Sequence, residues 1–178
     1  MKGSFWTTDK IVSLVAMGIS LLTLVIFVRQ TDIIEQQSHL SVMPYLRLEM
    51  SNDNQNHFTK MELFNYGVGP AIIESRELYY KGQWLDMEFA DFFRSKVPEM
   101  QEITLVANAN LAPGQAIPSG GTRLLLQMCD TQECHRRLFI AMQALQEGDF
   151  DYRIRYRSIY GDRWEIRSGQ SEPLALQP

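Results

Sequence analysis

The hydrophobic pattern begins with an uninterrupted apolar run near the start of the chain. No side chain from residue 11 to residue 28 is charged, and Lys10 and Arg29 close the two ends. At about 1.5 Å per residue, a helix of this length is about 27 Å long, close to the hydrocarbon thickness of a bilayer. The run predicts one transmembrane helix over residues 11–28, preceded by an N-terminal tail of residues 1–10.

Two other interpretations of the run fit less well. A cleaved signal peptide has a shorter apolar core followed by small residues at the cleavage site, and residues 28–32 (Val-Arg-Gln-Thr-Asp) offer no such site. A helix in the core of a globular domain rarely runs this long without a polar face. We therefore expect an uncleaved membrane anchor.

Helix-compatible sequence continues beyond the apolar run, until Pro44 disfavours helix in the residue before it. The segment over residues 29–43 is predicted to be a helical stalk. Its apolar stripe packs either on another copy of the chain or on the domain that follows. The stalk alone has fewer than two heptads, too few to establish a coiled coil. Ile33, Ile34, Gln37 and Leu40 fall near this stripe.

After Pro44 the pattern changes to short alternating runs. Leu46, Leu48 and Met50 fall on one face, and the polar residues 51–57 read as a loop. Short strands separated by turns every 8–12 residues are typical of a sandwich. We expect a mainly β fold over residues 44–178, an Ig-like β-sandwich of seven or eight strands. The predicted strands cover residues 45–50, 59–65, 70–80, 83–85, 102–107, 122–128, 152–158 and 164–167.

Two short helices interrupt the strands. Asp86 is predicted to cap the first, which carries three phenylalanines and ends before Pro98. The second opens with a capping-box pattern at residues 130–133 (Asp-Thr-Gln-Glu) and ends at Gly148. Both helices are expected to decorate the sandwich.

Composition excludes some classes of function. Residues 30–178 contain 14 of the 17 lysines and arginines but 20 of the 21 acidic residues. This acidic balance argues against a general nucleic-acid binder, whose affinity comes from neutralising phosphates. Two cysteines and three separated histidines are too few ligands for a structural zinc site. We expect no cofactor.

The charges that flank the apolar run bear on orientation. Lys2 and Lys10 precede it and Arg29 follows it, and no further lysine or arginine occurs before Arg47. The positive-inside rule then favours an N-terminus in the cytoplasm and a soluble domain in the periplasm. The opposite orientation, with a cytoplasmic domain, stays open at this point.

Three motifs resemble a family of small bacterial single-pass membrane proteins. They are residues 39–44 (His-Leu-Ser-Val-Met-Pro), 65–71 (Asn-Tyr-Gly-Val-Gly-Pro-Ala) and 156–161 (Tyr-Arg-Ser-Ile-Tyr-Gly). In that family a spanning helix is followed by His-x-x-Ser-Val-x-Pro and Asn-x-Gly-x-Gly-Pro-Ala. The resemblance implies a β-rich domain anchored in the inner membrane of a bacterium and carries over no catalytic residues. By itself, the second motif reads as a tight corner between two strands.

The last hairpin is the first candidate binding site. Arg153, Arg155 and Arg157 alternate with inward-facing residues, and Arg163 and Arg167 on the returning strand join the same face. Five guanidinium groups there could bind a phosphate, a lipid headgroup, a nucleotide or an acidic partner. The alternative is a solvated strand face balanced by nearby carboxylates.

Cys129 and Cys134 are the second candidate site. With Asp130 as the N-cap, they occupy the N′ and N4 positions, which a hydrophobic staple brings into contact. They form either a disulfide in an oxidising compartment or a reduced apolar pair in a reducing one.

Little in the sequence supports catalysis. No serine lies in a nucleophile elbow, and Cys134 beside His135 gives no nucleophile–base geometry by adjacency alone. We expect a non-enzymatic interaction or assembly protein of the inner membrane, bound to itself, to another membrane protein, or to both. The alternative is a membrane effector that senses a small anion or nucleotide through the arginine hairpin.

Overall fold

The computed structural model describes residues 8–147 and 150–176, and the chain divides into two compact units, Met1–Leu40 and Ser41–Pro178. Most of the predicted N-terminal tail (residues 1–7) and the predicted helix stop at Gly148 lie outside the described residues. The described part of the first unit is helical and belongs to helix α1 (Thr8–Ser41). It joins the predicted membrane segment and the predicted stalk without a break.

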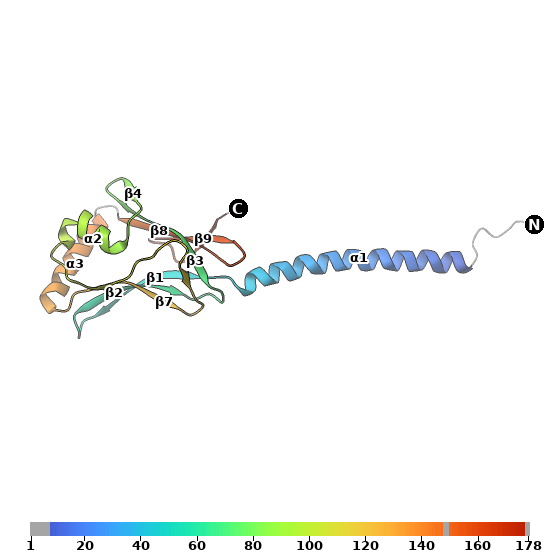
Figure 1. Ribbon diagram of the computed structural model, residues 1–178, viewed down its shortest axis with the longest axis horizontal. Coiled ribbons are helices and arrows are strands. Elements are labelled where there is room, and N and C mark those ends of the chain that lie inside the picture. Colours follow the sequence, from blue (N-terminus) through green and yellow to red (C-terminus); the bar gives the residue numbers. More distant parts are fainter. Residues whose placement is uncertain (1–7, 148–149, 177–178) are drawn as a thin grey trace, which may run out of the picture. The chain divides into compact units, whose positions relative to one another are not determined.

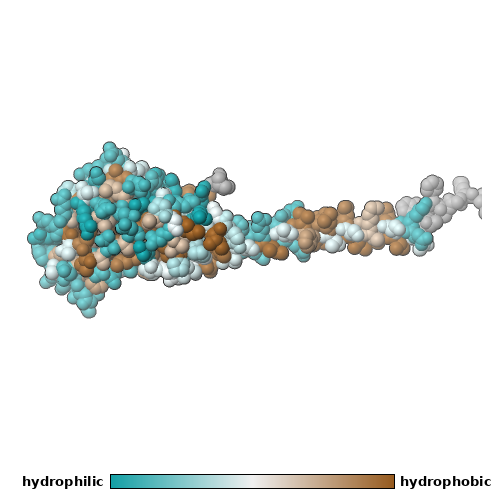
Figure 2. Space-filling model, in the orientation of Figure 1, coloured by the Kyte–Doolittle hydropathy of each residue, from teal (hydrophilic) through white to brown (hydrophobic). Residues whose placement is uncertain are grey.

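Helix α1 is the one helix in the described parts of the chain that is long and apolar enough to cross a membrane. Figure 2 shows its apolar segment in brown, with hydrophilic residues toward Ser41. The hydroxyl groups of Ser13, Ser20 and Thr23 each donate to the carbonyl four residues earlier, at 2.8, 2.9 and 2.9 Å. Their polar groups are therefore satisfied inside the helix, as a lipid environment requires.

The helix ends at Ser41, two residues before the predicted end of the stalk. The carbonyl of Met43 accepts hydrogen bonds from the backbone N–H groups of Val68 (3.1 Å) and Gly69 (3.4 Å). Because the segment after Ser41 is bonded to this loop, its backbone cannot also continue the helical ladder.

The second unit is a β-sandwich of two antiparallel sheets (Figure 1), which confirms the predicted fold class. One sheet has the order β1-β2-β7-β5, and the other has the order β10-β9-β8-β3-β4, with β6 also paired to β3. The strands of the first sheet are β1 (Leu46–Asp53), β2 (Phe58–Asn65), β7 (Thr122–Met128) and β5 (Leu105–Asn108). Those of the second are β3 (Ala71–Tyr80), β4 (Gln83–Leu85), β6 (Ala116–Ile117), β8 (Asp151–Arg157), β9 (Arg163–Arg167) and β10 (Leu174–Leu176).

The core lies between the sheets, where alternate residues of the central strands point inward. Leu63 and Leu126 come from the first sheet, and Ile73 and Tyr156 from the second; each is at most 1% exposed. The phenol oxygen of Tyr156 accepts a hydrogen bond from the backbone N–H of Leu46 at 3.3 Å. One buried side chain therefore links a strand of each sheet, and its burial raises the pKa of the phenol.

Three helical segments complete the domain: α2 (Phe89–Lys96), the 3-10 turn η1 (Pro98–Met100) and α3 (Gln132–Glu147). Residue Glu88, and not Asp86, precedes α2 as its N-cap. The hydroxyl of Thr131, and not the carboxylate of Asp130, accepts from the N–H of Cys134 at the start of α3. Both predicted caps were therefore wrong, by two residues and by one.

The structure differs from the predicted strands in four places. Strand β5 runs from Leu105 to Asn108, whereas a strand over residues 102–107 was expected. Strand β1 continues into the predicted polar loop as far as Asp53, because its backbone pairs with β2 and the hydroxyl of Thr59 bonds the side chain of Asn52 at 2.8 Å. Strands β6 and β10 bring the described total to ten, where seven or eight were expected. They have two and three residues, too few for a visible alternation.

Candidate functional site

Asn65 organises the corner where the chain enters the sandwich. Its side-chain oxygen accepts from the N–H groups of Tyr45 (3.1 Å) and Gly67 (3.0 Å). Its amide nitrogen donates to the carbonyls of Gly69, Ile117 and Pro118 at 2.8, 3.0 and 3.2 Å. Asn65 is 1% exposed. Every polar atom of this buried amide is therefore in use, which assigns it a structural role.

The two glycines of the same motif allow the entering segment to approach. A Cβ atom at Gly69 would lie 1.9 Å from the carbonyl oxygen of Val42, and one at Gly67 would lie 2.3 Å from the backbone nitrogen of Tyr45. Only a residue without a side chain fits at either position. The first two motifs of the sequence thus lie against each other, and they build a junction.

The third motif forms the turn between β8 and β9. Ser158 is fully buried, and its hydroxyl oxygen accepts from the N–H groups of Tyr160 (3.1 Å) and Asp162 (3.2 Å). Gly161 has a φ of 91°, which favours glycine. All three motifs are therefore explained by folding, and none presents a ligand site.

The five arginines of the last hairpin lie along β8 and β9, and each has a carboxylate partner. Glu74 and Glu77 on β3 and Glu165 on β9 supply these partners. The ion pairs are Arg153–Glu77, Arg155–Glu165 (2.7 Å), Arg157–Glu74 (3.8 Å), Arg163–Glu74 (3.0 Å) and Arg167–Glu165. The Arg153 guanidinium also stacks over the Trp84 ring at 4.2 Å.

The electrostatics of this face agree with an internally paired surface. Hydrogen bonding to Arg153 lowers the pKa of Glu77. Glu165 is 1% exposed, and this desolvation opposes its charged form, yet hydrogen bonds from Arg155 and Arg167 bring its pKa below the ordinary value. An external anion would have to displace a glutamate that the arginines already hold.

Cys129 and Cys134 are joined by a disulfide, and both residues are buried. Cys129 has a φ of 67° just before α3, and Cys134 lies in the first turn of that helix. Because Thr131 caps the helix, the cysteines are at the N″ and N3 positions, one residue away from the predicted staple pair. The disulfide fixes the start of α3 to the end of β7.

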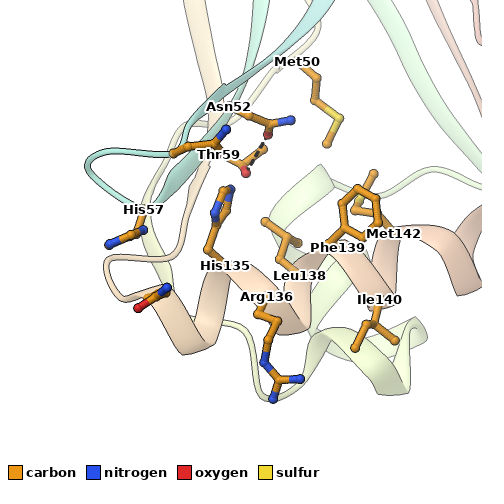
Figure 3. A pocket seen from close by; sticks show the side chains of 12 residues that line it. Met50, Asn52, His57, Thr59, His135, Arg136, Leu138, Phe139, Ile140 and Met142 are labelled. Carbon is orange, nitrogen blue, oxygen red and sulfur yellow. Dashed lines mark hydrogen bonds between the residues drawn. The ribbon is translucent and has the colours of Figure 1, made fainter.

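A groove of about 760 Å³, which was not among the predicted sites, opens between α3 and the end of the β1–β2 hairpin. Figure 3 shows Met50 pointing from β1 toward Phe139 and Met142 on α3, while His135 points toward Thr59. The twelve lining residues are Met50, Asn52, Asn54, His57, Thr59, Gln132, His135, Arg136, Leu138, Phe139, Ile140 and Met142.

The groove has an apolar half and a polar half. Phe139 is 75% exposed and Met50 is 44% exposed, so large apolar side chains face solvent across the opening. At the other half, the rings of His57 and His135 lie 6.4 Å apart between centroids. None of the twelve lining residues is acidic. A concave, mainly apolar surface with a few polar groups is the usual form of a binding site.

The groove also marks one end of the sandwich. Strand β1 starts beside the entry corner at Tyr45 and ends at the hairpin that borders the groove. Figure 1 places α3 at that same end of the sheets. An eight-residue strand is about 27 Å long, so the groove lies about that distance from the point where the chain enters the domain.

The described residues contain no group of three or more histidine, cysteine, aspartate or glutamate side chains that could hold a metal ion. No model of a known protein family matches the chain. A comparison with curated proteins also finds no match. The geometry of the groove, the arginine face and α1 is therefore the evidence for function.

Proposed function

We propose that this chain is a membrane-anchored, non-enzymatic interaction protein whose sandwich binds an apolar segment of a partner protein in the groove beside α3. Helix α1 is the anchor: it has an apolar segment of bilayer length and no buried residue. The observation that carries the proposal is the exposed apolar pair Met50 and Phe139 on facing walls of the groove. A soluble surface seldom exposes such a patch unless something covers it.

The chemistry of the groove indicates what it binds. Its apolar half matches aliphatic or aromatic side chains, and the absence of acidic residues from the lining avoids repulsion of a carboxylate or backbone carbonyl near His57 and His135. Methionine side chains such as Met50 and Met142 adapt their shape to different apolar surfaces, as is common at protein-binding sites.

The proposed location is the inner membrane of a bacterium, with the sandwich on the periplasmic side. The Cys129–Cys134 disulfide supports this side, because disulfides persist in oxidising compartments and are rare in the cytosol. The flanking lysines favour the same orientation. A groove far from the entry corner would then be accessible to a periplasmic partner or to another membrane protein.

Site-directed photo-crosslinking in living cells tests the groove. A photoreactive phenylalanine analogue at Phe139 should form adducts with a partner protein. Met50→Asp, which places a charge on the facing wall, should reduce the adduct at least tenfold. Lys81→Asp, on the exposed β3–β4 turn, should leave it unchanged. Failure to form an adduct, or an adduct insensitive to Met50→Asp, contradicts the proposal.

An anion sensor is the second hypothesis from the sequence, and no specific contact favours it. Its test is a ligand-induced thermal shift that charge reversal at Arg155 and Arg157 abolishes. The glutamate partners of both side chains make such a site the weaker proposal.

A further inference from the structure

Helix α1 carries a repeat along its whole length. Because Thr8–Ser41 is one unbroken helix, positions in the apolar segment and in the stalk share one helical register. Of the seven series of positions spaced by seven residues, six contain a polar or charged residue. The seventh is apolar from end to end and consists of Val12, Ile19, Ile26, Ile33 and Leu40.

A second series alternates with the first. Its members follow those of the first series by four residues and precede the next by three, which is the spacing of a coiled-coil seam. The four members are Ala16, Thr23, Gln30 and Gln37. We call the two series together the heptad seam. It spans more than four heptads, where the stalk alone has fewer than two.

The second series of the seam changes from small to amide side chains where the helix leaves the apolar segment. Inside that segment the second series has small residues, Ala16 and Thr23, which allow two helices to approach closely in lipid. The hydroxyl of Thr23 bonds the Ile19 carbonyl at 2.9 Å and so needs no other partner. Beyond Arg29 the series has amides, Gln30 and Gln37, which can bond their counterparts in a parallel pair and fix its register.

In the part of the chain that the structure describes, the apolar side chains of the stalk part of the seam are exposed. Between Arg29 and Ser41 only three residues are apolar; two of them, Ile33 and Leu40, lie on the seam, and the third, Ile34, is next to it. Ile33 is 54% exposed and Leu40 is 59% exposed. Outside the bilayer these side chains face water, and burying them against an identical helix is favourable.

We propose that the heptad seam pairs α1 with α1 of a second copy of this chain, in parallel and in register. The orientation follows from the anchor, because copies of one single-pass protein cross the membrane in the same direction. The pairing therefore rests on the proposed membrane anchor and is independent of the groove. It would present two copies of the groove on one membrane, so that a partner with two apolar segments could bind both.

Cysteine crosslinking of the full chain in isolated membranes tests the seam. Both native cysteines are held in the disulfide and do not compete. Ile33→Cys and Leu40→Cys should each form a covalent dimer on mild oxidation, at least tenfold faster than Glu35→Cys. Glu35 is the matched control, because it lies in the same stalk on the opposite side of the helix from the seam.

Three results would contradict the proposed pairing of α1 through the heptad seam. Equal crosslinking at Glu35→Cys and Ile33→Cys shows that no face of α1 is preferred. A membrane-bound chain with no crosslink at either seam position shows that α1 does not pair there. A chain that fractionates as soluble overturns the anchor and the seam together. The photo-crosslinking experiment at Phe139 tests the groove independently. A negative result there would not affect the interpretation of the cysteine crosslinks on α1.

Discussion

At the scale of single residues, the buried polar groups of the sandwich hold its backbone in place. Asn65 bonds five backbone groups drawn from three separate segments, and Ser158 bonds three backbone or side-chain groups within one turn. Such side chains replace ladder hydrogen bonds where the chain turns or enters. Substitutions at them should therefore affect folding and leave surface recognition unchanged in any molecule that folds.

Asn65→Ala should lower the free energy of unfolding by about 3 kcal/mol, because it leaves several buried backbone groups without partners. Chemical denaturation of the purified full chain in detergent, followed by tryptophan fluorescence, measures this loss. Asn54→Ala, at an exposed position in the β1–β2 turn, is the matched control and should change stability by less than about 0.5 kcal/mol. A loss at Asn65 no larger than at Asn54 contradicts the assigned role.

The lowered pKa values of Glu77 and Glu165 predict that the folded protein loses stability in acid. Their pKa values in the folded protein lie below the ordinary value of 4.5, so the folded state binds fewer protons than the unfolded state. Stability from the two carboxylates is therefore complete above about pH 5 and decreases as the pH falls below 4.5. Unfolding curves at pH 7 and pH 3.5 should show a smaller decrease for Glu165→Gln than for wild type. An equal decrease in both proteins would rule out a contribution from Glu165.

At the scale of elements, the alternation of apolar and polar residues predicted the limits of the longer strands, because local sequence determines them. Strands β2, β3 and β7 begin and end within a residue or two of their predicted limits, because their inward positions alternate clearly. Strand β6 was not predicted, because its two residues form a strand through their pairing with Ala71 and Ile72. The glutamate partners of the arginines were not predicted either, because they depend on the register between β3 and β8, which is a feature of tertiary structure.

The groove could not be predicted from the sequence for the same reason: it depends on tertiary structure. Met50 and Phe139 are far apart in the sequence, and each reads as an ordinary apolar residue of a strand or a helix. Only the placement of α3 against the hairpin leaves both exposed on facing walls. A signal for Phe139 was present, because Phe139 and Ile140 lie beside the buried stripe of α3 at Leu138 and Ala141. An apolar stripe wider than one buried face indicates a second contact.

At the scale of the whole molecule, the chain combines a helix with no buried residue and a domain with its own core. We propose a separate surface for recognition on each part, the heptad seam on α1 and the groove beside α3. The orientation of the proposed anchor would determine which partners each surface can meet.

Cysteine labelling in intact cells tests the proposed orientation. Lys81→Cys, on an exposed turn of the sandwich, should react with a membrane-impermeant maleimide without permeabilisation. Lys2→Cys, before the apolar run, should react only after the membrane is opened. The reverse pattern would place the sandwich in the cytoplasm and would leave its disulfide without an oxidising environment.

The pairing of β3 with β8 has a consequence for the order of events during biosynthesis. Strand β3 pairs with β4 and β6 only at its two ends, and β8 pairs with it from Ile72 to Tyr79. Because β8 follows β3, β5, β7 and α3 in the chain, the larger sheet cannot close until all of these segments have been synthesised. Contacts between such distant segments also form slowly. The proposed anchor would then have time to enter the bilayer while the sandwich is still unfolded, and the domain would complete its folding as a tethered chain.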